Sequence, residues 1–379
     1  MSEWINTTLG DIANLNMGQS PKSEFYNQEE IGLPFLQGNR TFGLKYPYFD
    51  TYCSEPKKVA SRGDILFSVR APVGDINIAN TEICIGRGLS AINAKNGNND
   101  FLYFLLHFLK NEIINNESGS VFGSINRTDL GNIKVQYPPI EEQKAIAEVL
   151  SSLDDKIDLL HRQNKTLEEL AQTLFRQWFI EEAKDDWEEV AVGDFVKTNV
   201  STLKKDTTLQ TIQYLDTSSL TKGKIDTFQE LDLTEAPSRA KRIVKHNDVL
   251  ISTVRPNQKH YGIIKNPTED IIVSTGYCVI SCEKINPHFI YILLTTEDMT
   301  EYLHSIAEGS TSTYPSLKPF DIEAVEFLLP PENKLKEFSN YADNAWEKID
   351  KNHIQINTLK ELRDTLLPKL MSGEVRVSC

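Results

Sequence analysis

The sequence contains no long apolar run and no cysteine pattern, and both absences exclude classes of protein. It has no apolar run of 18 residues, so we expect no transmembrane helix. The opening residues, MSEWINTTLGD, have neither a basic segment nor an apolar core, which argues against a secretory signal peptide. The five cysteines form no CxxC pair and the seven histidines are scattered. This distribution predicts buried reduced thiols, no metal site and a cytoplasmic protein.

Motifs of common enzyme classes are missing too. The sequence has no GxxxxGK[ST] phosphate loop and no GxSxG nucleophile elbow. The stretch Gly86-Arg87-Gly88 lacks a GxGxxG continuation, so we interpret it as a turn between strands. Neither Pro138-Pro139 nor Pro330-Pro331 has the polar residue before it and the aromatic after it that an amino-methyltransferase loop requires. The chain is therefore predicted to be non-catalytic.

The net charge of −14 argues against a simple nucleic-acid binder. The acidic surplus lies mainly in residues 141–186, with 6 basic and 12 acidic side chains, and in residues 187–331, with 14 and 20. A solvated acidic face would explain this surplus, and so would a surface that meets a basic partner subunit.

A stretch of 38 residues without glycine or proline, 141–178, predicts a long helix after Pro138-Pro139. Its apolar residues alternate at gaps of four and three, which is the a/d pattern of a coiled coil. Asn164 and Ala171 also lie on this seam. The residues that we expect to pair with another helix are Ile146, Leu150, Leu153, Ile157, Leu160, Leu167, Leu174 and Trp178.

A second seam follows 192 residues later, after Pro330-Pro331, and Pro368 is expected to end its helix. We expect the two helices to pair antiparallel, with Asn164 and Asn352 fixing the register. The alternative is that each seam packs on its own globular domain. The second seam also includes Ala342, Ala345 and Arg363, and its predicted pairing residues are Phe338, Ile349, Ile356, Leu359, Leu366 and Leu370.

The rest of the chain forms an internal repeat. Trp4 with Gly10-Asp11 matches Trp187 with Gly193-Asp194, and FLYFLL at 101–106 matches FIYILL at 289–294, which predicts a short buried helix in each copy. Many short strand patterns surround these helices, so we predict an α+β fold. The expected order is a domain over 1–140, a helix over 141–180, a second domain over 187–331 and a second helix over 332–371.

This organisation resembles the specificity (S) subunit of Type I restriction-modification systems. The resemblance covers the whole chain and rests on the PP-x-E-EQKAIAEVL helix start and the LLPKLMSGE ending. It implies two target-recognition domains, each reading one half of a bipartite double-stranded DNA site, with the helices as a spacer. It also implies two methyltransferase (M) subunits and the restriction (R) motor-nuclease subunits as partners, with S-adenosylmethionine, ATP and Mg bound by those partners and no cofactor in this chain.

Base readout requires donors and acceptors on loops that can reach a groove edge. The polar turns after the predicted strands are the candidates, although an ordinary exposed loop explains any single one of them equally well. In the first domain they are Gln37, Asn39, Arg40, Lys45, Arg70, Arg87, Asn126 and Arg127. In the second they are Thr217, Ser218, Ser219, Lys222, Lys224, Arg255, Asn257, Gln258, Lys259, His260, Thr311, Ser312, Thr313 and Tyr314.

Two function classes stay open on these residues. One is the DNA-specificity subunit, and the other is a tandem protein-interaction scaffold built on a coiled coil. Binding of DNA in the presence of methyltransferase subunits separates them. A catalytic methyltransferase is a third, weaker alternative, since it would require this chain alone to bind a cofactor.

Overall fold

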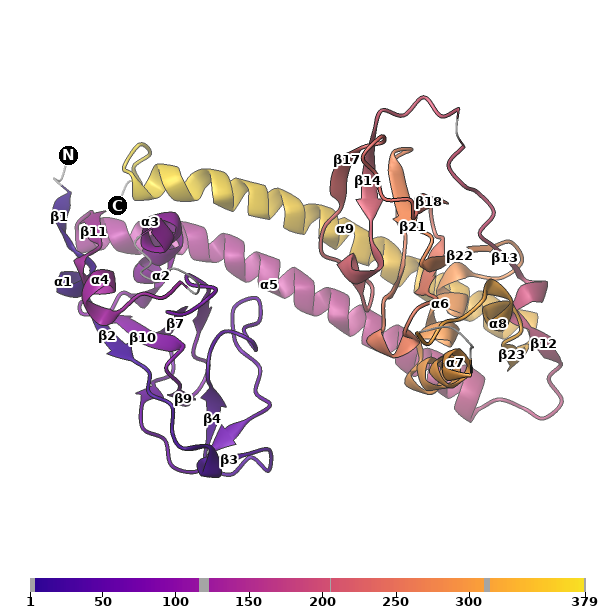
Figure 1. The fold of residues 1–379 in the computed structure, drawn as a ribbon, viewed down its shortest axis with the longest axis horizontal. Helices are drawn as coiled ribbons and strands as arrows, with labels where there is room; N and C mark the ends of the chain where they lie inside the picture. Colours follow the sequence, from indigo (N-terminus) through magenta and orange to yellow (C-terminus); the bar gives the residue numbers. More distant parts are fainter. Residues whose placement is uncertain (1–3, 116–122, 205, 310–313, 378–379) are drawn as a thin grey trace. The chain divides into compact units, whose positions relative to one another are not determined.

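A computed structural model describes residues 4–115, 123–204, 206–309 and 314–377. The chain forms two compact units, Met1–Arg162 with His353–Cys379 (unit 1) and Gln163–Asn352 (unit 2). The long helices α5 (Ile140–Arg176) and α9 (Glu332–Met371) contribute one part to each unit (Figure 1). Each unit therefore contains a globular domain and two lengths of helix.

Short strands build the domain of unit 1. A two-stranded sheet pairs β1 (Ile5–Thr8) with β11 (Lys134–Tyr137). One larger sheet has the order β2 (Ala13–Met17), β10 (Leu89–Ala94), β7 (Ile65–Ser68), β8 (Ile76–Ile78). The other has the order β3 (Tyr26–Asn27), β5 (Tyr52–Cys53), β4 (Leu33–Leu36), β9 (Ile83–Ile85), β6 (Val59–Ala60).

The domain of unit 2 repeats this topology, which confirms the internal repeat. Its two-stranded sheet pairs β12 (Glu189–Ala191) with β23 (Glu326–Leu328). The next sheet runs β13 (Val196–Thr198), β22 (Tyr277–Cys282), β19 (Val249–Ser252), β20 (Tyr261–Ile263). A further sheet runs β17 (Gln229–Asp232), β14 (Thr211–Leu215), β21 (Ile271–Ser274), β18 (Ala240–Ile243). The small hairpin of β15 (Leu220–Thr221) and β16 (Lys224–Ile225) is inserted after β14.

Short helices complete each domain, and the predicted α+β fold is confirmed. The two FLYFLL-type segments form α2 (Asn99–Phe108) and α6 (Pro287–Thr295), as predicted, and both are buried. Asn98 and Asn286 cap these helices by accepting backbone N–H bonds. The other short helices are α1 (Leu9–Ile12), α3 (Lys110–Asn115), α4 (Arg127–Asn132), α7 (Glu297–Glu308) and α8 (Pro319–Glu323).

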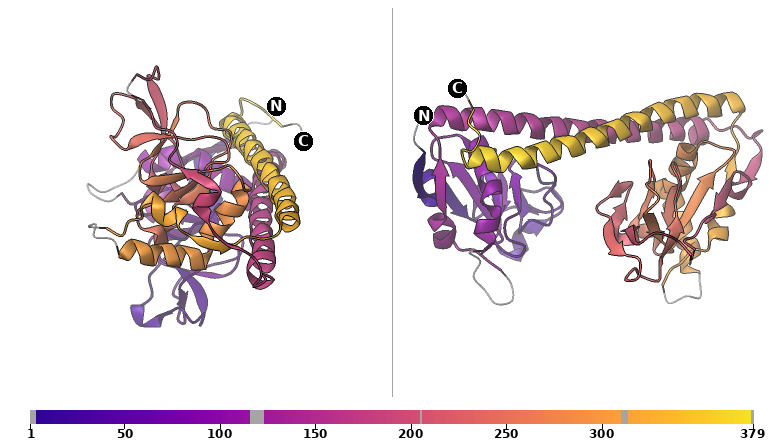
Figure 2. Two further views of the ribbon diagram at one scale, coloured as in Figure 1. Left: turned by 90° about the vertical axis from the view of Figure 1, so that its right-hand side faces the viewer. Right: turned by 90° about the horizontal axis from the view of Figure 1, so that it is seen from above.

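The long helices pair antiparallel within each unit, as their seams predict (Figure 2). In unit 1, Ile146 and Leu150 of α5 share a core with Leu370 of α9, and Ile157 and Leu160 pack with Ile356. In unit 2, Ala171 and Phe175 of late α5 and Phe179 just after it share a core with residues of early α9, namely Phe338, Ala342 and Ala345. The other predicted pairing residues, Leu153, Leu167, Leu174, Trp178, Leu359 and Leu366, are half-buried, and Ile349 is buried. Both halves of each seam also pack on the globular domains. Pairing between the helices and packing on the domains, which were alternatives in the sequence, therefore occur together.

Polar residues complete the pairing. In unit 2 the buried Asn352 donates from Nδ2 to Oδ1 of Asn164 at 2.7 Å. In unit 1 Arg363, which interrupts the second seam, donates to Asp154 at 3.0 Å. An amide pair and an ion pair therefore occupy the positions where apolar residues are missing.

The prediction that Pro368 ends the second helix is wrong, because α9 continues to Met371 with Pro368 inside it. Proline has no backbone N–H, so the carbonyl of Asp364 lacks its helical hydrogen bond. Because Pro368 is exposed, this carbonyl can bond to water instead. Leu370 and Met371 are buried in the core of unit 1, and this burial favours the last turn. The first helix ends differently, in a π-helical turn over Gln177–Glu181 that buries Phe179.

Candidate nucleic-acid interface

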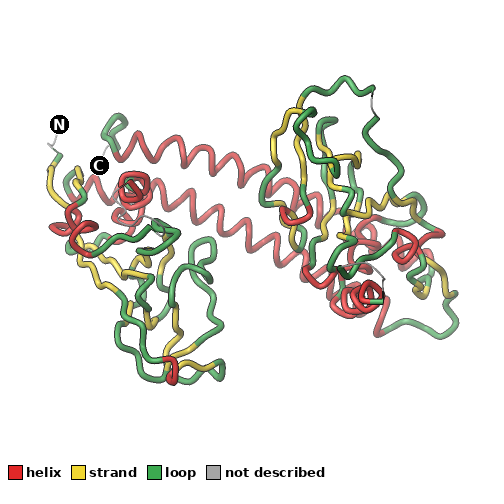
Figure 3. Tube along the Cα trace, in the orientation of Figure 1, coloured by secondary structure: helices red, strands yellow, loops and turns green. Residues whose placement is uncertain are grey.

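Among the described residues, each domain has one pair of parallel strands, and some of the polar candidates follow the carboxyl ends of that pair. Figure 3 shows in green the loops that connect the strands of each domain. In unit 1, β4 and β9 are parallel, with Leu36 opposite Ile85. In unit 2, β14 and β21 are parallel, with Leu215 opposite Val273. Parallel strands end at the same edge of a sheet, so the residues after them come together. Gln37 and Asp216 take equivalent positions at these edges.

The edge in unit 1 is a hollow of about 700 Å³. Gln37 accepts a hydrogen bond from Ser20 Oγ at 2.9 Å, and Arg40 is paired with Asp50 at 2.8 Å. The Arg87 side chain is exposed and has no carboxylate partner among the described residues. The residues that line the hollow include Ser20, Tyr26, Phe35, Gln37, Arg40, Thr51 and Arg87.

The Gly86-Arg87-Gly88 stretch is the turn between β9 and β10, as predicted. Gly88 N donates to the Gln37 carbonyl at 3.1 Å, and a Cβ at position 88 would lie 2.5 Å from that oxygen. Only glycine permits this approach of the two turns. The close packing presents Arg87 next to Gln37.

The remaining candidates of the first domain lie elsewhere. Asn39 donates to Asp75 at 2.6 Å, and Lys45 is half-buried and donates to Asp155 of α5 at 2.6 Å. Asn126 caps α4 by accepting from two backbone N–H groups, and Arg127 is the exposed first residue of that helix. Arg70 is exposed and forms an isolated bridge with Ser124.

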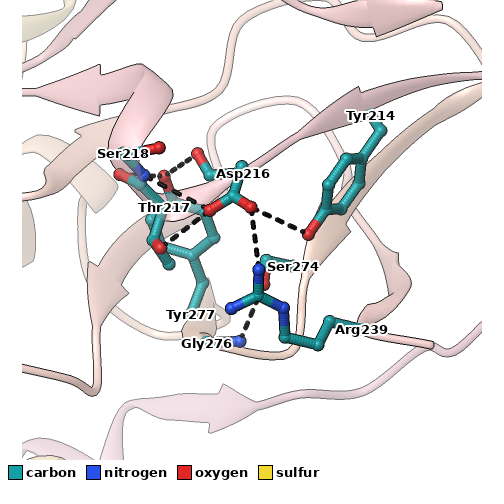
Figure 4. Close-up of polar contacts among 8 residues, drawn as sticks. All are labelled: Tyr214, Asp216, Thr217, Ser218, Arg239, Ser274, Gly276 and Tyr277. Atoms are coloured by element: carbon teal, nitrogen blue, oxygen red, sulfur yellow. Dashed lines mark hydrogen bonds and ion pairs between the residues drawn. The ribbon is translucent and has the colours of Figure 1, made fainter. Parts of the chain in front are cut away.

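In unit 2, Asp216 organises the edge (Figure 4). Its Oδ1 accepts from Thr217 Oγ1 at 3.0 Å and from Ser218 N at 3.4 Å. Its Oδ2 accepts from Arg239 Nη2 at 3.1 Å and from Tyr214 Oη at 3.5 Å. Burial opposes ionisation of this carboxyl, but the hydrogen bonds from Thr217 and Ser218 and the charge of Arg239 outweigh it and lower the pKa of Asp216.

The hairpin after this turn carries further candidates. Ser219 N donates to the Asp216 carbonyl at 3.1 Å, which closes the turn. Lys222 is exposed and has a left-handed backbone with φ of 47°, and Lys224 is paired with Asp226 at 2.8 Å. Both lysine side chains therefore stand on the tip of the hairpin.

A tight turn at residues 255–259 carries a second group. Arg255 and Lys259, with φ of 49° and 58°, enclose the turn Pro256–Gln258, so Asn257 and Gln258 are exposed. Left-handed backbone at non-glycine residues is costly and is concentrated at functional sites. The Arg255 guanidinium lies 4.8 Å from the ring centre of Tyr314, a cation–π arrangement.

The neighbouring candidates have partners within unit 2. Lys259 donates to Glu297 at 2.5 Å, and His260 Nδ1 lies 2.7 Å from the Leu220 carbonyl oxygen. Thr311, Ser312 and Thr313 lie outside the described residues.

The bridges refine the repeat alignment. Arg70 is bridged to Ser124 as Val254 is bridged to Ser316. Arg70 and Arg255, which the sequence patterns align, are therefore displaced by one residue from one another.

Arg239 and Asp216 were missed by the sequence reasoning. Arg239 precedes β18, and Lys57 precedes the equivalent strand β6. Pro56-Lys57 and Pro237-Ser238-Arg239 share a proline followed closely by a basic residue, and this shared pattern was the signal that could have identified Arg239.

Comparison with known proteins adds the family. Residues 1–169 match the model of the Type I restriction modification DNA specificity domain. A putative type I restriction enzyme MjaX specificity subunit from Methanocaldococcus jannaschii is 46% identical over 170 residues, or 44% of this chain, and the chain spans only 40% of that relative. The MjaIX specificity subunit of the same organism is 26% identical over 99% of this chain and 94% of its own length. The chain is therefore similar to specificity subunits of type I restriction enzymes, most clearly over its first 169 residues.

The fold agrees with that of a solved structure. The crystal structure of the type I S subunit from M. genitalium has a TM-score of 0.62 at 16% identity and covers 98% of this chain and 96% of its own. No helix among the described residues is long and apolar enough to span a membrane. No group of three or more potential ligands that could hold a metal ion occurs among them either.

Proposed function

We propose that each globular domain of this specificity subunit reads one half of a bipartite double-stranded DNA target. The observation that carries this proposal is the repeat of one polar edge in both units. Gln37 and Asp216 follow equivalent strands, and each lies beside an exposed arginine. A tandem scaffold without a DNA role requires no such repeated set of base-edge donors and acceptors.

The two long helices act as the spacer in this proposal, and they dock two methyltransferase subunits. The acidic surplus of residues 141–186 supports a basic partner surface. Phosphate neutralisation, which dominates affinity for DNA, then comes largely from the partners, while this chain supplies base readout. S-adenosylmethionine, ATP and Mg are bound by the methyltransferase and motor-nuclease subunits, and the complex acts in the cytoplasm.

The test uses this chain purified alone and together with methyltransferase subunits from the same host. Methylome sequencing of the host gives the target, and gel shifts then compare duplexes with and without that target at several salt concentrations. We expect tight, salt-sensitive and sequence-specific binding only by the complex. Binding that ignores the sequence of the duplex would contradict the proposal.

Variants at the two edges sharpen this test. Arg87→Ala should weaken binding to the target by about 5- to 100-fold, since one good base contact contributes about 1–3 kcal/mol. Lys134→Ala, on an exposed position of β11 outside both long helices, removes the same charge and should have a smaller effect.

A further inference from the structure

The strongest unexplained feature is the arginine held at the edge of the second domain. Arg239 lies in the loop between β17 and β18, and its side chain is 58% exposed. Its backbone carbonyl accepts from Thr275 N at 2.8 Å, which fixes the loop to the end of β21. Its guanidinium is therefore placed beside the parallel strand ends although the loop itself is on the surface (Figure 4).

Asp216 orients this guanidinium. The Asp216 side chain is only 18% exposed, and both carboxylate oxygens already accept from neighbouring residues. One Arg239 N–H donor is directed at Asp216 Oδ2, and its other four donors make no hydrogen bond to the described residues of the chain. A carboxylate that is itself held by hydrogen bonds restricts the plane of the guanidinium before a ligand arrives.

The chemistry of the remaining donors points to one kind of base. Guanine presents the O6 and N7 acceptors side by side in the major groove, and the planar arginine fork binds both at once. Ordering the side chain in advance reduces the conformational entropy lost on binding. We propose that Arg239 reads a guanine in the half-site of the second domain and that Asp216 is its positioning residue. This inference rests on the proposed function of that domain.

Two other roles compete with base readout. A phosphate contact would use the same exposed charge, but it would not depend on the base sequence. A purely structural ion pair would leave DNA binding unchanged. An ion pair near the edge of the first domain, Arg40 with Asp50, is more exposed at 71% and 40%, so its orientation is less restricted.

The experiment measures binding by the complete chain in complex with its methyltransferase subunits. The duplexes carry the methylome-derived target with each base pair of the second half-site replaced in turn. Arg239→Ala, Arg239→Lys and Asp216→Asn are compared with the parent. Lys241→Ala is the matched control, because it removes the same charge from an exposed position two residues further along.

Discrimination at a base pair is the ratio of the affinities for the target duplex and for the duplex in which that pair is replaced. We expect Arg239→Ala to lower this ratio about 5- to 100-fold at one G·C pair and to leave it unchanged at the other positions. Arg239→Lys should lose part of it, since lysine lacks the fork, and Asp216→Asn should weaken discrimination at that same pair. Lys241→Ala should alter no single position.

Other outcomes overturn the inference. If Arg239→Ala weakens binding equally on every duplex and reduces the salt dependence, the residue contacts phosphate. If Arg239→Ala and Arg239→Lys both discriminate like the parent, the ion pair is only structural. If the parent complex itself shows no sequence preference, the proposed function of the chain fails. That result can be told apart from a failure of the Arg239 inference, which is seen only when the variants are compared with a sequence-specific parent. Thermal unfolding of each variant identifies any loss of the fold.

Discussion

Glu168 shows how burial alone can make a single residue sensitive to pH. It lies on the part of α5 that belongs to unit 2. Burial, and secondarily the charge of Glu169, raises the pKa of Glu168 from 4.5 to about 7. Its charge also contributes to the raised pKa of Tyr261 and of Tyr291, so these groups are close together. In the described part of the chain no basic side chain forms an ion pair with Glu168.

The sign of the effect on stability follows from linkage. Between pH 4.5 and about 7 the folded protein keeps a proton on Glu168 that the unfolded chain has lost. The free energy of unfolding therefore falls as pH rises through this window. We expect the free energy of unfolding of Glu168→Gln to be about 1–3 kcal/mol higher than that of the parent at pH 8. At pH 4 the two proteins should differ little.

Chemical denaturation at several pH values measures this difference. Glu169→Gln is the control, because Glu169 is exposed and paired with Lys165 at 3.7 Å. A difference between Glu168→Gln and the parent that stays constant from pH 4 to pH 8 would contradict the assignment.

Single residues also show where sequence reasoning stops. The scattered histidines gave no reason to single out His288, yet it is buried against Trp346 and its two ring nitrogens lie 3.0 Å from Asp343 and 2.8 Å from Lys265. Burial, and then the charge of Lys265, lowers the pKa of His288 to about 3. Four residues from three distant parts of the sequence meet here, and no periodic pattern encodes such a contact.

At the scale of elements, the seams were predictable because heptad spacing places residues on one helix face whatever the partner is. The sequence predicted where polar residues interrupt the seam, but it did not predict every residue that they pair with. Asn164 and Asn352 do pair, whereas Arg363 pairs with Asp154, which lies off the predicted seam. The buried face at the end of the first helix differs from the predicted seam: Phe175 and Phe179 are buried, and Leu174 and Trp178 are only half-buried.

The asparagine pair gives a prediction for unit 2. Asn352→Leu leaves the amide of Asn164 buried without its 2.7 Å partner, so we expect a loss of about 1–3 kcal/mol of unfolding free energy. Asn164→Leu combined with Asn352→Leu replaces both amides by apolar side chains and should recover most of the loss. Denaturation of the two single variants and the double variant measures this coupling. Additive losses would show that the amides do not act as a pair.

Helix length carries a second prediction, which rests on the spacer role proposed above. Seven residues inserted after Arg162 and seven after Asn352 keep both seams in register, since the seam repeats every heptad. They add about 10 Å to each helix, and the DNA gap should lengthen by about three base pairs at 3.4 Å each. Both half-sites should stay the same in methylome sequencing. A seven-residue insertion at residues 183–186, outside both helices, is the control and should keep the original gap. An unchanged gap in the helix variant would refute the spacer.

For the whole molecule, the sequence predicted two copies of one domain and two long helices, because repeats and periodicity are visible without any knowledge of packing. It did not predict which part of each long helix packs in the core of which domain. In unit 2, Phe175 of α5 lies 5.0 Å from Phe289 of α6, and Phe338 of α9 lies 6.1 Å from Phe289, measured between ring centres. The core of the second domain thus includes helix residues outside 187–331.

This core decides how a recognition domain should be exchanged with that of a relative. Replacing 187–331 alone would place a foreign domain on Phe175, Phe179 and Phe338, whereas replacing residues 163–352 transfers the whole core. Mismatched core packing costs about 1–3 kcal/mol or more. We therefore expect both chimeras to change one half-site and keep the other, and the 163–352 chimera to have the higher unfolding temperature. Methylome sequencing and thermal unfolding of the two chimeras test this expectation. Changes in both half-sites would disprove independent reading, while equal unfolding temperatures would show that the helix residues are not part of the domain core.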